Sequence, residues 1–156
     1  QNRITINSKI PLFELKDQKG ELFKVADFIG RKNLIIYFYP KDSTPGCTLE
    51  GQQFRDHINE FEQLNTVIFG ISRDSIKKHE NFKKKQAFPF DLLSDADDTV
   101  CNLFGVMQLK KLYGREYMCV DRSTFLIDAD GVLRHEWRSV KVKGHIEDVL
   151  TTLKSL

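Results

Sequence analysis

One cysteine stands where the chain passes from an apolar run into a helical pattern, and a thiol in such a place can act as a nucleophile. The apolar run ends at Pro40, a short polar loop follows, and Thr44 and Pro45 suit an N-cap and a first helical position. This count places Cys47 at the third helical position. Unpaired backbone N–H groups and the positive end of the helix dipole favour thiolate over thiol there. The sequence therefore makes Cys47 a candidate nucleophile.

The alternative is that Cys47 is an inert core residue, because free cysteines are among the most buried residue types. Its neighbours Ser43, Thr44 and Thr48 are polar, and it lies off the apolar stripe of the following helix. Both interpretations stay open on spacing alone, and spacing does not identify the electrophile. If the thiol is reactive, we expect its sulfur at the mouth of a pocket at the strand end, where ligands bind in open α/β sheets.

The elements that must position this cysteine include buried strands. Continuous apolar runs rich in β-formers are typical of strands covered on both faces. Three runs have this character: residues 33–39, 66–71 and 123–127. Turn signals predict two hairpins, which join residues 13–15 to 22–24 and residues 123–127 to 132–137. In the second hairpin Gly131 supplies the positive φ that the turn requires.

Helical patterns lie between these strands. After Pro45 four apolar residues recur at helical spacing and predict one continuous helix: Phe54, Ile58, Phe61 and Leu64. Three further helices are predicted at residues 75–85, 99–104 and 145–153. Strands that alternate with helices predict an α/β fold, with a mixed central β-sheet flanked by helices and an N-terminal β-hairpin. We expect one domain over residues 1–156, because no linker or repeat divides the chain.

The composition excludes several classes of protein. The 156 residues are 40% hydrophobic and 29% charged, with only four prolines and nine glycines, so the chain is neither disordered nor collagen-like. The longest apolar run, residues 34–39, is far shorter than the roughly 18 residues of a membrane-spanning helix. A net charge of +2 gives no electrostatic basis for binding nucleic acid or an anionic membrane. We expect neither partner.

The cysteine content favours a reducing compartment. Cys47, Cys101 and Cys119 are an odd number without Cys-x-x-Cys spacing, which predicts neither a disulfide framework nor a zinc site. We therefore expect an intracellular, cytoplasmic protein. Residues 1–4 have no signal-peptide pattern, and the missing initiator Met allows for a leader that was removed.

The segment around Cys47 resembles the active-site signature of the peroxiredoxins, which are thiol peroxidases built on an elaborated thioredoxin-like fold. The matching signature is Pro40-x-x-x-Thr44-x-x-Cys47. The wider string of residues 37–48 is similar to one subfamily, the bacterioferritin comigratory protein or peroxiredoxin Q group. Five further segments follow in the order of that family: residues 10–15, 70–74, 90–95, 104–106 and 122–131. The resemblance thus covers nearly the whole chain.

The resemblance implies roles for five residues. Cys47 would attack the O–O bond of hydrogen peroxide or an alkyl hydroperoxide and become a sulfenic acid. Thr44 would hydrogen-bond the peroxide or thiolate, and Pro40 would shape the pocket and shield the sulfenic acid. Arg122 would stabilise the thiolate and polarise the peroxide oxygens, oriented by Glu50. Without the resemblance, Arg122 would be a solvated charge and Glu50 an ordinary surface helix residue. No metal, haem, flavin or other cofactor is implied.

The chain departs from the subfamily at the resolving cysteine. Gln52 and Lys83 occupy the two positions at which many members carry it. The simplest inference is a one-Cys mechanism, in which thioredoxin, glutaredoxin or glutathione reduces the sulfenic acid. Cys101 is expected to be buried and inert. Cys119, three residues before Arg122, stays a candidate resolving thiol, although a strand-edge cysteine is more commonly structural. Because relatives are often monomers, the resemblance implies a monomer.

Two other classes of function would use the same cysteine. A cysteine hydrolase would pair Cys47 with a histidine as base. No hydrolase signature accompanies the four histidines, which suit exposed or core-edge positions better: His57, His79, His135 and His145. A redox sensor would keep the peroxiredoxin fold but stall after one oxidation. Steady-state peroxide consumption separates the sensor from the peroxidase.

Overall fold

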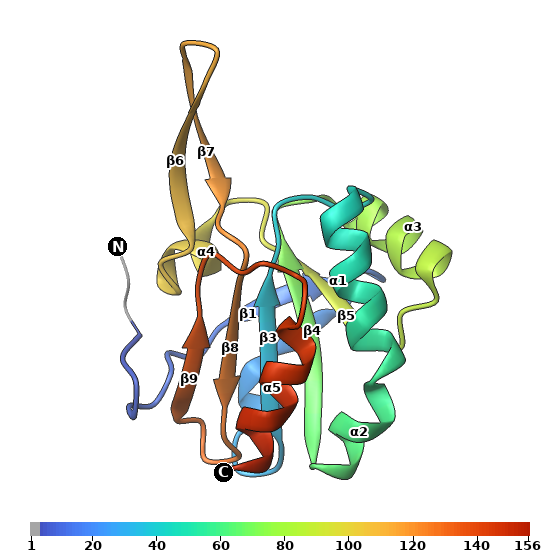
Figure 1. Cartoon of the computed structure of the whole chain (residues 1–156), viewed down its shortest axis with the longest axis vertical. Helices are drawn as coiled ribbons and strands as arrows, with labels where there is room; N and C mark the ends of the chain where they lie inside the picture. The colour runs from blue at the N-terminus through green and yellow to red at the C-terminus, as the bar shows by residue number, and fades with distance from the viewer. Residues whose placement is uncertain (1–3) are drawn as a thin grey trace.

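Nine strands and five α-helices make up the computed structural model of the chain, which describes residues 4–156 (Figure 1). The strands are β1 (Glu14–Asp17), β2 (Leu22–Lys24), β3 (Asn33–Phe38), β4 (Thr66–Ser72), β5 (Asp91–Ser94), β6 (Met107–Leu112), β7 (Arg115–Val120), β8 (Ser123–Ile127) and β9 (Leu133–Trp137). The helices are α1 (Pro45–Asp56), α2 (Ile58–Gln63), α3 (Ile76–Gln86), α4 (Thr99–Leu103) and α5 (His145–Lys154), with a 3₁₀ turn η1 (Val25–Asp27). Residues 1–3 of the N-terminal segment considered above lie outside the described part.

Seven strands form the central mixed sheet, in the order β2-β1-β5-β4-β3-β8-β9. β3 lies near the middle, parallel to β4 and antiparallel to β8. The parallel β3–α1–α2–β4 unit confirms the strands predicted at residues 33–39 and 66–71, with helical structure between them. The α/β class, the mixed sheet and the N-terminal hairpin are confirmed as well.

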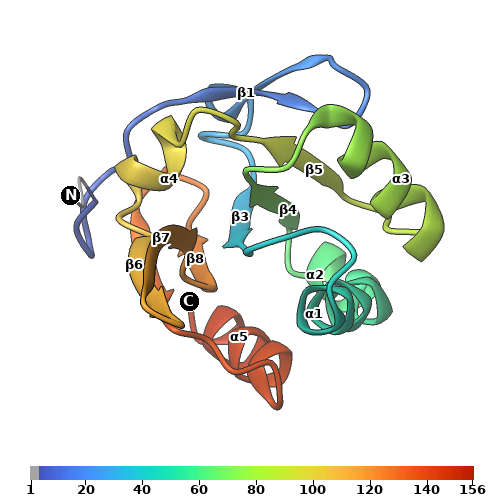
Figure 2. The ribbon, with the colours of Figure 1, turned by 90° about the horizontal axis from the view of Figure 1, so that it is seen from above.

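Helices cover both faces of this sheet (Figure 2). Because side chains alternate along a strand, Leu34, Ile36 and Phe38 of β3 join one apolar cluster, and Ile35, Tyr37 and Tyr39 join the other. The first cluster packs against α4 and the N-terminal hairpin. The second packs against α1, α2, α3 and α5, and it contains Cys47. None of the helices within residues 4–156 is long and apolar enough to cross a membrane.

One local expectation was wrong, and two elements were not predicted. The predicted continuous helix after Pro45 is two helices, because the chain breaks at His57, whose ring Nδ1 donates to the Gln53 carbonyl at 2.8 Å. Strand β5, only four residues long, was not predicted. A third hairpin, β6–β7, was also missed; it projects from the body, and neither of its strands pairs with the central sheet (Figure 1). Its turn residues Tyr113 and Gly114 both have positive φ.

Candidate active site

Cys47 lies in the first turn of α1, directly after the end of β3. Thr44 is the N-cap, with extended backbone, and Pro45 is the first helical residue, which confirms the predicted helix start. The side chain of Cys47 packs in the apolar cluster beneath α1 and is only 2% exposed. The expectation of a sulfur at an open pocket mouth is therefore wrong for this conformation. The candidate nucleophile is covered, and its polar contact comes from a neighbouring guanidinium.

Arg122 supplies that contact. Its Nη2 donates to the Cys47 sulfur at 3.5 Å, and its Nη1 donates to Glu50 Oε1 at 2.7 Å. Gly46 permits this approach, since a Cβ at that position would lie 3.1 Å from Arg122 Nη2. The guanidinium is thus held between a carboxylate and the sulfur, and it is not the solvated charge that its place in the sequence would suggest.

The sheet topology explains why Arg122 reaches Cys47. β8 runs antiparallel to β3, with Ser123 opposite Phe38. The residue before β8 therefore lies beside the end of β3, where the chain turns toward α1. Glu50 is one helical turn beyond Cys47, so it projects from the same side of α1. Arg122, which is more than 70 residues further along the chain, thus meets Cys47 and Glu50 at the end of β3.

Burial and the partner's charge act in opposite directions on the pKa of each member of the Arg122–Glu50 pair. Glu50 is fully buried, and its second oxygen, Oε2, has no hydrogen-bond partner among the described residues. Burial raises the pKa of Glu50 from 4.5 to about 7, although Arg122 favours the ionised form. Burial also opposes the charge of Arg122, but Glu50 and Cys47 outweigh it and raise the Arg122 pKa. Glu50 is therefore no surface helix residue.

The raised pKa of Glu50 predicts how stability changes with pH. Between pH 4.5 and about 7 the folded protein keeps the Glu50 proton that the unfolded chain releases. The free energy of unfolding should therefore lose about 1.4 kcal/mol per pH unit from this group as the pH rises through that range. Chemical denaturation of the wild type and of Glu50→Gln measures it, because only the wild type contains this contribution. His145, whose pKa burial lowers to about 4, contributes the opposite slope to both proteins. Parallel curves for the two proteins would contradict the prediction.

Thr44 and Pro40 bound the loop that precedes α1. The hydroxyl of Thr44 donates to the Lys41 carbonyl at 2.8 Å, so Thr44 occupies the N-cap position but its side chain closes the loop and makes no capping hydrogen bond to the helix. Ser43 has a left-handed backbone with φ of 63°, which is uncommon for a residue with a side chain. Pro40 is exposed at the strand end. The loop is tightly folded around these residues.

The histidines correct another expectation. His79 and His145 are buried, not exposed or at the core edge. His79 contacts Asp42 and the Leu93 carbonyl through its two ring nitrogens, and His145 Nε2 contacts the Thr124 hydroxyl at 2.8 Å. These contacts point away from a Cys–His hydrolase. The hydrogen-bond partners of His79 and His145 are distant in the sequence, so residue spacing did not indicate these contacts.

Cys101 and Cys119 differ in burial, and Gln52 and Lys83, which replace the resolving cysteine, both make hydrogen bonds. All three cysteines are free. Cys101 is fully buried, as expected, and burial together with Asp95 raises the pKa of its thiol. Cys119 is half-buried in β7. Gln52 donates to Gln86 Oε1 at 2.9 Å, and Lys83 donates to the Phe90 carbonyl at 2.8 Å.

Helix α1 is joined closely to the end of α3. Arg55 Nη1 donates to the Gln86 carbonyl at 2.8 Å, next to the contact of Gln52 with the same residue. Gly51 faces the ring of Phe88 so closely that a Cβ there would overlap the ring atoms. The second half of α1 is therefore fixed against its neighbour.

Within residues 4–156 no group of three or more His, Cys, Asp or Glu residues could hold a metal ion.

Comparisons with known proteins agree on one family. Residues 6–136 match the AhpC/TSA family. The chain is 50% identical over 153 residues to "Peroxiredoxin Bcp" of Bacillus subtilis, and the alignment covers 98% of this chain and 97% of that protein. A solved cysteine-to-serine variant of Xylella fastidiosa PrxQ superposes with a TM-score of 0.92 at 38% identity, over 97% and 96% of the two chains. The Xanthomonas campestris bacterioferritin comigratory protein, whose structural study concerns alkyl peroxide reduction, gives 0.88 at 41% identity, over 94% and 96%.

Proposed function

This chain belongs to the AhpC/TSA family of peroxiredoxins, and on that premise we propose that Cys47 is the residue with which it reduces hydroperoxides. The protein is a thiol peroxidase of the Bcp, or peroxiredoxin Q, type. The observation that carries the assignment is the 3.5 Å contact of the Arg122 guanidinium with the Cys47 sulfur, while Glu50 holds the same guanidinium at 2.7 Å. A fixed positive charge beside a sulfur favours its ionised, nucleophilic form.

The first step is a two-electron transfer of oxygen. The Cys47 thiolate attacks the terminal oxygen of the hydroperoxide, an S–O bond forms and the O–O bond breaks. Sulfur is oxidised to the sulfenic acid, and the leaving hydroxide or alkoxide takes a proton and departs as water or an alcohol. Negative charge moves from sulfur to the leaving oxygen, and Arg122 stabilises it by charge-assisted hydrogen bonds. Hydrogen peroxide and alkyl hydroperoxides are the proposed substrates.

Thr44 and Pro40 are proposed to orient the peroxide. The Thr44 hydroxyl donates its hydrogen bond to the Lys41 carbonyl, which leaves the lone pairs of the hydroxyl oxygen free to accept the O–H of a hydroperoxide. Pro40 ends the strand beside this loop and would cover the approach to the sulfenic acid. Glu50 would act through Arg122, whose orientation it fixes. No cofactor takes part in these steps.

The second half of the cycle is proposed to use an external thiol. The reductant attacks the sulfenic sulfur, water leaves and a mixed disulfide forms, and a second thiol then releases Cys47. Gln52 and Lys83 stand where a resolving cysteine would be expected, and Cys101 is buried. Thioredoxin, glutaredoxin and glutathione are the candidate reductants. This is a one-Cys cycle.

Mass spectrometry after one equivalent of hydrogen peroxide tests this proposal. We expect one oxygen atom on the peptide that contains Cys47, or the corresponding dimedone adduct, and no intramolecular disulfide. Cys119→Ser is the matched control and should leave the products and the turnover rate unchanged within about twofold, because no bond to Cys119 is needed. A Cys47–Cys119 disulfide would contradict the one-Cys cycle. Oxidation confined to a different cysteine would contradict the assignment of Cys47.

The setting of the enzyme is proposed from the same features. Three free cysteines suit a reducing compartment such as the cytoplasm. A monomer is proposed from the family resemblance alone. One sheet joins strands from residue 14 to residue 137, which supports a single domain.

A further inference from the structure

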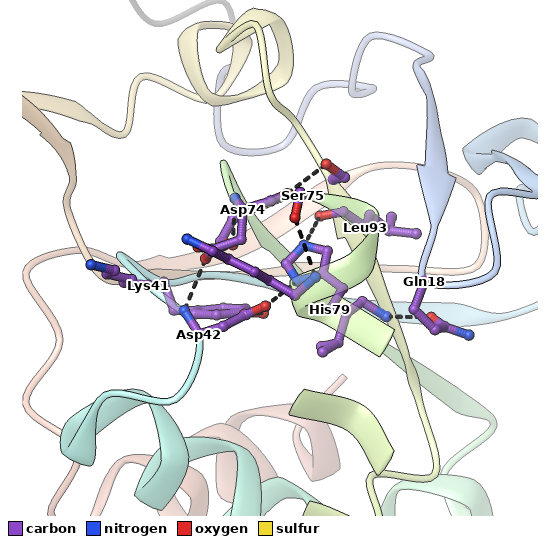
Figure 3. Close-up of polar contacts among 12 residues, drawn as sticks. Gln18, Lys41, Asp42, Asp74, Ser75, His79 and Leu93 are labelled. Carbon is purple, nitrogen blue, oxygen red and sulfur yellow. Dashed lines mark hydrogen bonds and ion pairs between the residues drawn. The ribbon is translucent and has the colours of Figure 1, made fainter. Parts of the chain in front are cut away.

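A buried polar pair lies directly behind the active-site loop. Asp42, in the loop, and His79, on α3, point toward each other, with His79 Nδ1 2.6 Å from Asp42 Oδ2 (Figure 3). Their side chains are 3% and 0% exposed. The other oxygen of Asp42 accepts the hydroxyl proton of Tyr39 at 2.6 Å, and His79 Nε2 lies 3.0 Å from the Leu93 carbonyl. The proposed peroxide step uses neither residue.

The contacts of the pair determine how many protons it holds. The Leu93 carbonyl only accepts, so His79 Nε2 must carry a proton. A second proton must lie between Nδ1 and Asp42 Oδ2, whether it belongs to the ring or to the carboxyl group, because two lone pairs would repel at 2.6 Å. Either arrangement has no net charge, which makes its complete burial tolerable. Burial raises the pKa of Tyr39, so its hydroxyl remains a donor.

The pair connects the loop to the rigid body of the protein. Asp42 follows Pro40 by two residues and precedes Thr44 by two. Its backbone N–H donates to Asp74 Oδ2 at 2.9 Å, so both its side chain and its backbone are held. His79 is fixed in turn by α3, whose N-cap Ser75 accepts from the Lys78 N–H at 3.2 Å (Figure 3).

We propose that the His79–Asp42 pair positions the loop of residues 40–44 for the reaction with peroxide, so that Pro40 and Thr44 keep fixed positions relative to the Cys47 sulfur. The proposal rests on the function proposed above. His79 and Asp42 act as positioning residues, through the shape of their hydrogen bonds and not through their charge. Displacement of the loop should slow the reaction that needs an oriented peroxide, and it should spare the intrinsic reactivity of the sulfur, which depends on Arg122.

Two substitutions of Asp42 separate shape from charge. In Asp42→Asn the amide can donate to Nδ1 of a neutral His79 and still accept from Tyr39, so every bond is kept and the charge is lost. In Asp42→Glu the carboxylate is kept, but an extra methylene displaces it and the loop. His79→Phe keeps most of the ring volume and removes both bonds of the imidazole. Phe61→Leu, in the buried part of α2, is a destabilised control away from the loop.

The measurement is the ratio of two rate constants for Cys47, one with hydrogen peroxide and one with iodoacetamide, in the folded reduced protein. We expect this ratio to fall about tenfold or more in Asp42→Glu and His79→Phe. It should stay within about threefold of the wild type in Asp42→Asn, and remain unchanged in Phe61→Leu at a comparable loss of Tm. A general loss of stability would lower Tm without changing the ratio.

Two results would overturn the proposal. One is a wild-type ratio in Asp42→Glu, and the other is a loss in Asp42→Asn as large as that in Asp42→Glu. The Asp42 comparison decides the matter even if His79→Phe does not fold. If wild-type Cys47 reacts with iodoacetamide but not with peroxide, the proposed function fails instead, so the two failures are distinguishable.

Discussion

Replacement of Cys47 by serine should reduce peroxide consumption to the uncatalysed background. A serine hydroxyl is not ionised at neutral pH and is a poor nucleophile without an adjacent base. The Arg122 guanidinium, 3.5 Å from the sulfur, would favour an anion there but provides no base to take the hydroxyl proton. The measurement is steady-state loss of hydrogen peroxide with dithiothreitol in excess, compared with the wild type at equal concentration.

Cys101→Ser is the matched control for this loss. Cys101 is also buried and also lies near the start of a helix, but burial and Asp95 raise the pKa of its thiol and make it unreactive. This variant should retain nearly the full rate once its folding has been checked by circular dichroism. Full activity in Cys47→Ser, or loss of activity in Cys101→Ser with the fold intact, would show that the wrong sulfur has been assigned.

Replacement of Arg122 by alanine should have the next largest effect. In the proposed step the guanidinium is the donor aimed at the charge that develops between sulfur and peroxide, and loss of one such donor typically costs about 10²–10³-fold in rate. The substitution also leaves Glu50 buried without its partner, which should lower the free energy of unfolding most above about pH 7, where the wild-type carboxyl group is ionised. Stopped-flow rates with hydrogen peroxide and urea unfolding measure the two effects separately.

A second substitution distinguishes the two roles of Arg122. In Arg122→Ala/Glu50→Gln the buried carboxyl group is gone, so most of the lost stability should return while the peroxide rate stays low. Arg138→Ala is the matched control, because Arg138 is likewise half-buried and donates to the carbonyls of Phe104 and Gly105. Recovery of the peroxide rate in the double variant would mean that Arg122 serves only to neutralise Glu50.

Local sequence patterns were sufficient for most of the fold. The buried strands β3, β4 and β8 are continuous apolar runs, and the start of α1 follows from the residue types of Thr44 and Pro45. Strand β5 is too short to show a pattern, and it is held by its neighbours β1 and β4. The turn of β6–β7 is Tyr113-Gly114, which lacks the Asn or Asp that usually marks this kind of hairpin.

The site was predictable only where it is local. Cys47 at the third position of α1 could be placed from four consecutive residue types. Its meeting with Arg122 depends on β8 lying antiparallel beside β3, and strand pairing over this distance leaves no trace in residue spacing. Only the family resemblance suggested that contact. The Asp42–His79 bond joins residues 37 apart, and neither residue type indicates the other as its partner.

The close packing of Gly51 on Phe88 limits how the oxidised cysteine can be presented to a reductant. From Gly51 onward α1 is held against the end of α3 by packing on that ring and by the hydrogen bonds to Gln86. The helical turn that carries Cys47 precedes these contacts. We therefore expect any fraying that exposes the sulfur to a bulky thiol to be confined to the first turn, while the rest of the helix stays docked.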